Sequence, residues 1–387
     1  MAEGPRETRA DRVVPNEGLL LRAAGSLEPA DARAAWLAFR ERVPEGQESL
    51  VERRLLPLVF RNRLRLDLKA EPGLRLAYAE SFAANARILS QAAPALRALR
   101  EASIPTMVLK GTALLVAHYR DLGARPMSDV DILVAEDRMA EAIDVLEALG
   151  WRGDPARRWL ASDSHAGNVV SPEGLVADLH RHATCEARFR EADEGFFANA
   201  IPIEVAGAPT AAMSAGDQLL HTVIHGLRWS IAPSSIWVLD AITLLRGPNV
   251  DVARTAARAG DLRLSAAFQQ GLGIVRDILG TDETLDRLRQ ELGQRTPGRS
   301  EAVEHWFRVR EPAGLLGALP NLWFGYRRSA PGGRVPVSGF PSFLGQAWRL
   351  EPGESPSRLV IAKVGRRLRA AAPVFRRFRG ASGGRRP

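Results

Sequence analysis

The sequence has 387 residues, of which 45% are hydrophobic and 25% are charged, with a formal net charge of +8. This composition is ordinary for a globular protein and leaves room for two or three domains. Cys185 is the single cysteine, which excludes a disulfide within the chain, and no stretch approaches the roughly 18 uninterrupted apolar residues of a membrane span. The polar first residues do not resemble a signal peptide, so we expect a cytoplasmic protein in which Cys185 is an ordinary thiol.

The positive charge is concentrated at the C-terminal end. Residues 357–387 contain ten basic and no acidic residues, which leaves 43 basic and 45 acidic residues, a net charge of −2, in the rest of the chain. Binding to a nucleic-acid backbone needs a continuous basic surface, so the near-neutral body argues against a nucleic-acid partner. The tail also contains apolar side chains, which favours weak contact with an anionic membrane or partner; a solvated tail is the alternative.

The N-terminal part is predicted to be helical. Residues 1–17 are polar with mixed charge, and we expect disorder there. Apolar side chains then recur at helical spacing over residues 31–43, 49–66 and 76–102, with Pro-Glu-Gly and Glu-Pro-Gly turns between them. We assign residues 18–102 to an N-terminal helical region, in which no pattern indicates chemistry.

The next stretch predicts a strand, a turn and a helix. The short apolar run at 107–109 is bounded by Pro105 and Gly111, which is typical of a buried strand. A turn at Lys110, Gly111 and Thr112 leads into an apolar helix that ends near residue 119, and a basic loop over 120–126 follows. Lysine occurs only at positions 69, 110 and 363 of this Arg-rich chain. An ammonium contacts a phosphate as a point charge, which suits Lys110; an ordinary turn lysine is the alternative.

Two carboxylates then share one face of a predicted strand. Asp129 and Asp131 occupy alternate positions of the strand at 129–134, and strand side chains alternate faces with period two. Neighbouring carboxylates repel each other and are tolerated best with a cation between them, for which magnesium is the expected ion. A solvated pair on an edge strand is the alternative.

The rest of the central region, 103–212, alternates helices and strands. A helix at 138–149 places Ile143, Leu146 and Leu149 on one face before Gly150 ends it, and hairpins are predicted at 165–180 and 203–212. Asp178 is a charge in the otherwise apolar strand 175–180, and a third metal-site carboxylate would explain it. The alternatives are a cap or an Arg partner for Asp178, and a structural role beside Asp178 for His180, which shares its face.

Helices dominate again after the central region. We expect a helical domain over 213–295 that begins at the N-cap Ser214, with helices at 235–245, 251–259, 264–279 and 283–292. His221 and His225 have the i, i+4 spacing of zinc ligands, but no third ligand is evident, which favours core or pocket histidines. Residues 296–356 read as an irregular C-terminal region with a short helix at 302–309, and residues 357–387 form the basic tail.

The combined pattern resembles a known family. Lys-Gly, an apolar helix, Arg-Pro-x-Ser-Asp-x-Asp-Ile-Leu-Val, a helix and Asp-Leu-His together resemble the DNA polymerase beta-like nucleotidyltransferase superfamily, over roughly residues 75–290. More narrowly, the chain looks like a bacterial family described as uncharacterised nucleotidyltransferases. The resemblance implies an α+β fold with a small mixed sheet flanked by N-terminal and C-terminal helical regions.

The resemblance also implies a set of site residues. The glycine turn would hold the nucleotide phosphates, and three acids would hold two magnesium ions, one bound by all three and the other by Asp129 and Asp131. The narrower family shows a histidine, a tryptophan and an aspartate after the sheet, matched here by His225, Trp229 or Trp237, and Asp240. The implied catalytic and metal-binding residues are Asp129, Asp131 and Asp178, and the nucleotide-binding residues are Lys110, Gly111, Thr112, Arg125, Ser128 and His180.

The implied activity is a magnesium-dependent nucleotidyltransferase. It would move a nucleoside monophosphate from a nucleoside triphosphate to a hydroxyl of a small molecule or a protein by a two-metal mechanism. A catalytically inactive protein that keeps the fold and binds nucleotide or a partner is the alternative. The near-neutral body argues against a third interpretation, transfer to a nucleic-acid end.

Overall fold

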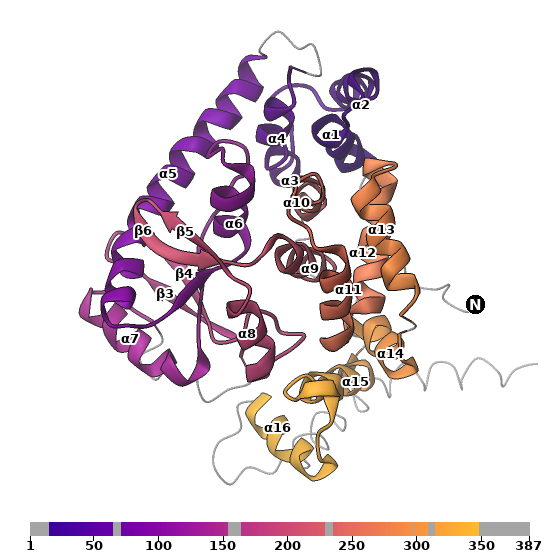
Figure 1. Ribbon diagram of the computed structural model, residues 1–387. Helices are drawn as coiled ribbons and strands as arrows, with labels where there is room; N and C mark the ends of the chain where they lie inside the picture. The colour runs from indigo at the N-terminus through magenta and orange to yellow at the C-terminus, as the bar shows by residue number, and fades with distance from the viewer. Residues whose placement is uncertain are drawn as a thin grey trace, which may run out of the picture.

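The computed structural model describes residues 15–64, 71–153, 164–228, 235–295, 297–308 and 314–347. Figure 1 shows a sheet with its covering helices on one side and a block of helices on the other. The predicted α+β fold with helical regions on both sides of a mixed sheet is therefore confirmed. The expected basic tail at 357–387 and residues 1–14 lie outside the described residues, and the domain boundaries stay predictions.

The sheet is built from short strands. The strands are β1 (Thr106–Val108), β2 (Val130–Val134), β3 (Ala166–Val170), β4 (Val176–His180), β5 (Ile201–Val205) and β6 (Ala208–Ala212). Within the described residues they form one sheet in the order β3-β4-β2-β1-β6-β5. β1 and β2 are antiparallel, β2 pairs in parallel with β4, β1 pairs in parallel with β6, and the two hairpins form the edges. Both predicted hairpins are confirmed, with Gly174 and Gly207 at positive φ in their turns.

Helices cover the sheet and lead into the site. The long helix α5 (Pro72–Glu101) packs against β5, β6 and α7 (Met139–Ala148), while α8 (Arg190–Phe197) follows β4 (Figure 1). After β1, the chain enters α6 (Lys110–Ala113) and a π-helical segment, η2 (Leu114–Tyr119). A short 3₁₀ turn, η3 (Glu136–Arg138), precedes α7. Ile143 and Leu146 are buried as predicted, but Leu149 is 40% exposed because α7 ends at Ala148.

The N-terminal helices pack onto the second helical block. The helix predicted over 49–66 is divided at Leu55, because Pro57 is accepted in the first turn of a helix but not in its interior. Helix α1 begins at Pro15, inside the segment expected to be disordered, and contacts α2, α4, α10 and α12. The N-terminal helices are α1 (Pro15–Gly25), α2 (Pro29–Arg42), α3 (Leu50–Arg53) and α4 (Leu56–Arg61).

The helical block that follows the sheet matches the predicted segments closely. Ser214 accepts a hydrogen bond from the Asp217 amide and caps α9, as predicted. The helices are α9 (Ala215–Gly226), α10 (Ile236–Leu245), α11 (Val252–Asp261), α12 (Ser265–Leu279) and α13 (Glu283–Gly293). The apolar core is continuous from the N-terminal helices through the sheet to this block.

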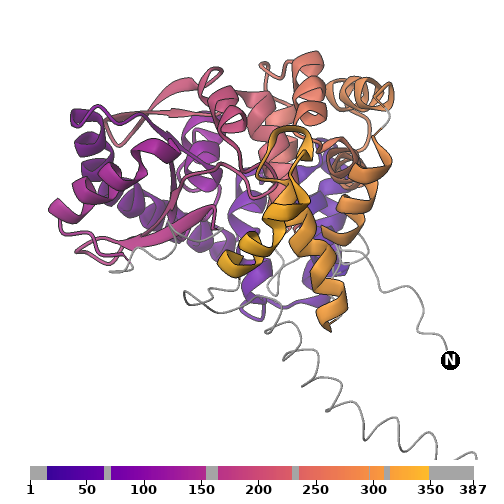
Figure 2. The same ribbon diagram turned by 90° about the horizontal axis from the view of Figure 1, so that it is seen from below.

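The C-terminal region contains more helix than its Gly- and Pro-rich composition predicts. Pro320 lies inside α15, and the aromatic rings of Trp323, Tyr326, Phe340 and Phe343 pack against one another between α15 and α16. Figure 2 shows these two helices projecting beside the helical block. The elements are α14 (Arg299–Arg308), α15 (Gly314–Arg327), η4 (Pro331–Gly333), η5 (Val337–Gly339) and α16 (Phe340–Ala347). None of the described helices is both long enough and apolar enough to cross a membrane.

Candidate active site

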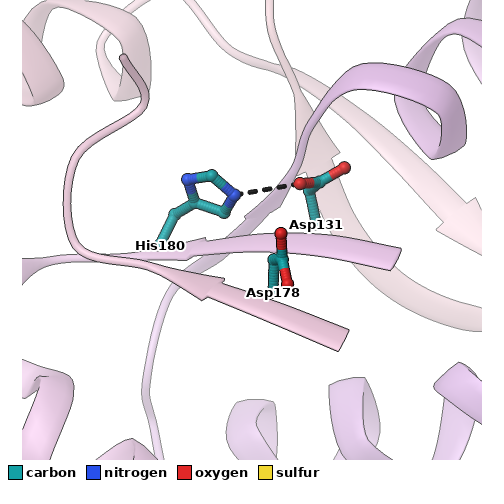
Figure 3. Close-up of side chains that lie close together, drawn as sticks. All are labelled: Asp131, Asp178 and His180. Atoms are coloured by element: carbon teal, nitrogen blue, oxygen red, sulfur yellow. Dashed lines mark hydrogen bonds and ion pairs between the residues drawn. The ribbon is translucent and has the colours of Figure 1, made fainter. Parts of the chain in front are cut away.

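The predicted acids meet at two neighbouring strands. β2 and β4 run parallel, and their register places Asp131 directly beside Asp178. Asp129 immediately precedes β2 and lies two residues from Asp131, while His180 lies two residues from Asp178 on β4. Figure 3 shows Asp131, Asp178 and His180 projecting from these strands toward one another. The expectation that Asp178 lies on the strand next to Asp131 is confirmed.

Asp131 is the most enclosed of the three acids. It is 3% exposed, and its Oδ1 lies 2.9 Å from His180 Nε2 (Figure 3). It also forms an ion pair with the Lys110 ammonium. Burial alone would raise the pKa of Asp131, but the hydrogen bond to His180 and the charge of Lys110 outweigh it and hold this pKa well below its ordinary value. Asp131 is therefore an anionic carboxylate at all physiological pH values.

Asp129 and Asp178 are half-buried, and neither forms an ion pair of the kind that joins Asp131 to Lys110 among the described residues. The pKa of Asp129 is raised, chiefly by burial and then by the negative charges of Asp131 and Asp178. The positive charge of Lys110 lowers this pKa but does not cancel the increase. Ser128 contacts Asp129 at 3.4 Å, and Asn168 donates a hydrogen bond of 2.7 Å to Asp178. The partner of Asp178 is thus an asparagine on β3, and His180 bonds Asp131 rather than Asp178. The carboxylates of Asp129, Asp131 and Asp178 repel one another, which a bound cation would relieve.

Three ligand atoms lie close enough to share one cation. A carboxylate oxygen of Asp131, one of Asp178 and a ring nitrogen of His180 all lie within 4.8 Å of one another. Carboxylate oxygens suit magnesium and manganese, and imidazole suits the transition metals, so this donor set fits a divalent cation. Asp129 lies outside this group of three. The resemblance implies Asp129, Asp131 and Asp178 as the metal ligands, whereas the group found in the structure contains His180 and not Asp129.

The Lys110–Gly111 turn is tightly packed beside the acids. Lys110 has a φ of +45°, in the left-handed region, and its ammonium lies on Asp131. A Cβ atom at Gly111 would lie 2.7 Å from Arg125 Nη1 and 3.0 Å from Met127 Cγ, so a larger residue would have to displace the side chain of Arg125. Thr112 is buried and faces Met127, with 3.9 Å between Oγ1 and Sδ. Contact of this turn with phosphates stays a prediction.

A buried network joins this turn to the helical block. Arg125 donates two hydrogen bonds to Asp240 on α10, from Nε at 2.8 Å and from Nη2 at 3.0 Å. The hydroxyl of Tyr119 donates a third, at 2.9 Å. Burial and the charge of Asp240 raise the pKa of Tyr119. Asp240 therefore holds the Arg125 guanidinium in place against Gly111. Asp240 is the aspartate that the resemblance implies after the sheet, and it contacts the Lys110–Gly111 turn through Arg125.

These groups line a cleft of about 440 Å³ between the sheet and the helical block. His221, His225 and Trp237 form its helical wall, and Gly226 lets the Trp237 ring approach, since a Cβ there would lie 2.2 Å from Trp237 Cγ. Trp229 lies outside the described residues. Among the predicted site residues, those lining the cleft are Lys110, Gly111, Arg125, Ser128, Asp129 and Asp131.

One family model matches more than half of the chain. The model described as "Uncharacterised nucleotidyltransferase" matches residues 48–280. The chain belongs to this family. The resemblance indicated by the residue pattern is confirmed, and the matched segment includes the whole sheet, the cleft and α9 to α12.

The solution structure of the antibiotic-resistance factor ANT(2'')-Ia is similar with a TM-score of 0.33 and 16% sequence identity, over 57% of this chain and 97% of that chain. A search of curated proteins gave no significant match.

Several residues that line the cleft of this nucleotidyltransferase-family protein are not predicted from its sequence. Arg54 enters the cleft from the turn between α3 and α4, a region that shows no chemical pattern in the sequence. Arg228 lies at the end of α9 and bonds Glu186 through Nε at 2.9 Å and Nη2 at 2.6 Å. Burial and the charges of Lys110 and Arg228 lower the pKa of His221 to about 3. His221 Nε2 donates to the Ala183 carbonyl at 3.0 Å, which agrees with a pocket histidine and not a zinc ligand.

Proposed function

We propose that this protein transfers a nucleoside monophosphate from a nucleoside triphosphate to a hydroxyl group of a small molecule or a protein. The observation that carries the proposal is the placement of Asp131 and Asp178 side by side on parallel strands, with Asp129 lining the cleft next to them. Membership of the nucleotidyltransferase family supports the reaction class.

Divalent cations fit the acidic cluster. Asp129, Asp131 and Asp178 would hold them, with His180 either as a further ligand or as the group that orients Asp131. Bound there, two magnesium ions would supply Lewis-acid stabilisation of the triphosphate and of the attacking oxygen. A cation bound at Asp131 would repel the Lys110 ammonium and compete with it for the carboxylate, which would free Lys110 to contact a phosphate oxygen.

The chain's own groups account for the remaining steps. Asp178 would accept the proton of the acceptor hydroxyl, whose oxygen forms the new bond to the α-phosphorus. The bond from that phosphorus to the β-phosphate bridging oxygen breaks, and its electron pair leaves with pyrophosphate. Amides of Gly111 and Thr112 would face the phosphates, with Arg125 held in place behind the turn by Asp240.

One observation favours the alternative of a nucleotide-binding protein without catalysis. The Lys110 ammonium pairs with Asp131, so a cation has to displace an existing ion pair before it can bind there. Binding and transfer must therefore be measured separately.

The experiment combines both measurements. Thermal shift and calorimetry with ATP, GTP, CTP and UTP, each with and without Mg²⁺ or Mn²⁺, would establish nucleotide binding and its metal dependence. Incubation with α-³²P-labelled nucleotides and a metabolite extract or the protein itself would then detect label on an acceptor. Metal-dependent labelling supports the transferase, binding without labelling supports the alternative, and no binding contradicts both.

A further inference from the structure

The positively charged side chains of the cleft are already paired, with one exception. The cleft is lined by Lys110, Arg54, Arg125 and Arg228. Three of these four cations have a carboxylate partner: Lys110 pairs with Asp131, Arg125 with Asp240 at 2.8 Å, and Arg228 with Glu186 at 2.6 Å. Within the described part of the chain, the side chain of Arg54 has neither a hydrogen bond nor an ion pair; its backbone amide donates to the Glu52 carbonyl.

The backbone around Arg54 is anchored on both sides. Arg54 follows α3, whose N-terminus is fixed by a capping box between Ser49 and Glu52, and it precedes the buried Leu55 and Leu56. Its backbone is helical, with φ −66° and ψ −19°. The backbone therefore presents the side chain to the cleft while the neighbouring side chains anchor the turn in the core.

Among the residues that the structure describes, no carboxylate lies close enough to the Arg54 guanidinium to form an ion pair with it. Arg54 is solvent-exposed at the cleft, but partial desolvation and then the charge of Arg125 lower the pKa of Arg54, and the charges of Asp129 and Asp240 offset this only in part. Both oxygens of Asp240 are engaged by Arg125. Two guanidinium groups thus act on one another in the cleft, next to the Gly111 turn, and an anion placed between them would remove their repulsion.

We propose that Arg54 binds the β- and γ-phosphates of the nucleoside triphosphate and the pyrophosphate that leaves. This inference rests on the proposed nucleotidyl transfer and assigns the phosphate end of the nucleotide to this side of the cleft. A guanidinium presents a planar fork of donors that matches two phosphate oxygens, and it stays charged at every working pH. When the bond to the α-phosphorus breaks, the electron pair stays on pyrophosphate, and the added negative charge lies where Arg54 can stabilise it.

The proposal gives the N-terminal helices a part in the site. Arg54 lies within residues 48–280, the segment matched by the family model. The turn between α3 and α4 would therefore contribute to the same cleft as Asp129 and Asp131 from the sheet.

The test compares the binding of a nucleoside triphosphate, of a nucleotide that lacks the β- and γ-phosphates, and of pyrophosphate without a nucleoside. Isothermal titration of the full-length protein with Mg²⁺ and ATP, AMP or inorganic pyrophosphate is compared for wild type, Arg54→Gln, Arg54→Lys and the control Arg53→Gln. Arg53 is the neighbouring residue and is exposed like Arg54, but it does not line the cleft; it donates to the Gly46 carbonyl at 3.2 Å. We expect Arg54→Gln to weaken ATP and pyrophosphate by at least about tenfold and to leave AMP unchanged, because charge-assisted bonds to phosphate are the strong ones. Arg54→Lys should fall in between, and Arg53→Gln should match wild type.

The outcomes separate the two proposals. If wild type binds ATP and Arg54→Gln binds ATP and pyrophosphate equally well, the Arg54 inference is wrong while the proposed function stands. Equal weakening of AMP also contradicts it, because Arg54 would then contact the nucleoside or the α-phosphate. If wild type binds no nucleoside triphosphate, both proposals fail. Arg54→Gln should melt within about 2 °C of wild type, the effect of a surface substitution; if it unfolds, Arg54→Lys supplies the comparison.

Discussion

The two aspartates of the Asp-x-Asp pair have different physical roles. Asp131 is buried, pairs with the Lys110 ammonium and is hydrogen-bonded to His180, so its charge stabilises the fold. Asp129 is half-buried, and burial together with the charges of Asp131 and Asp178 raises its pKa, so its charge opposes folding. The sequence pattern treats both residues alike, because it shows that they share a face but not what lies opposite each one.

Neutral substitutions of the two aspartates should therefore separate activity from stability. Asp129→Asn and Asp131→Asn should each lower nucleotidyl transfer by at least about 100-fold, the scale of losing one preorganised electrostatic contact. Asp129→Asn should keep or raise the melting temperature. Asp131→Asn should cost about 1–3 kcal/mol of unfolding free energy, because it removes the carboxylate charge that pairs with Lys110 and replaces one of the two carboxylate oxygens with an amide donor.

Urea unfolding and label-transfer assays check both expectations. Asp144→Asn, on α7, serves as the control for loss of one negative charge outside the cleft. Wild-type turnover in either variant of the pair would contradict the proposed site. Equal destabilisation by both would contradict the assigned electrostatics.

At the scale of elements, the turn between β1 and η2 depends on the absence of a side chain at Gly111. A Cβ in Gly111→Ala would lie 2.7 Å from Arg125 Nη1 and would push that guanidinium away from Asp240. We expect a loss of about 1–3 kcal/mol, typical of overpacking, and weaker nucleotide binding. Gly293→Ala is the control, since a Cβ there meets no atom within 4 Å and alanine favours a helix. Urea unfolding and calorimetry measure both effects; unchanged ATP affinity in Gly111→Ala would argue against the turn as a nucleotide contact.

Helix α9 should make folding sensitive to acid. Burial and nearby cations lower the pKa of His221 to about 3, against about 6.5 in an unfolded chain. Below pH 6.5 the unfolded state binds a proton that the folded state does not, so stability falls as pH falls. The slope approaches about 1.4 kcal/mol per pH unit, or about 2 kcal/mol between pH 6.5 and 5.

Substitution isolates this contribution. His221→Gln can still donate to the Ala183 carbonyl but cannot titrate, so its unfolding free energy should vary less between pH 7 and 5 than that of wild type. Urea unfolding at several pH values provides the measurement, with His305→Gln on α14 as the control. An unchanged acid dependence in His221→Gln would show that other groups dominate it.

At the scale of the molecule, one cleft draws on three parts of the chain. Arg54 comes from the N-terminal helices, Lys110 and Asp131 from the sheet region, and His221 and Asp240 from α9 and α10. These parts share one apolar core, so the cleft depends on the packing of the helical regions against the sheet. A fragment limited to the predicted α/β core at 103–212 would lack two of its walls.

The basic tail should be dispensable for transfer chemistry, because every described residue that lines the cleft lies between Arg54 and Asp240. Deleting residues 357–387, which carry ten positive charges, should leave nucleotide binding and transfer to a diffusible acceptor unchanged. It should also abolish salt-sensitive binding to vesicles that contain phosphatidylserine, to which each basic residue contributes about 1 kcal/mol. Co-sedimentation at low and high salt measures this. Full-length protein that ignores such vesicles at low salt contradicts membrane contact, and loss of folding on deletion would make the tail part of the packed domain.

Much of this protein is determined by local sequence. Strands, hairpins and helices follow from the period of apolar residues and from Gly and Pro at the turns, and alternation along a strand places Asp178 and His180 on one face. The family follows from motifs that lie close together in the chain. Tertiary structure alone decided which groups meet across the fold: His180 with Asp131, Arg125 with Asp240, and Arg54 with the cleft. Such pairings join residues far apart in sequence, and they depend on strand order and helix packing, which periodicity does not encode.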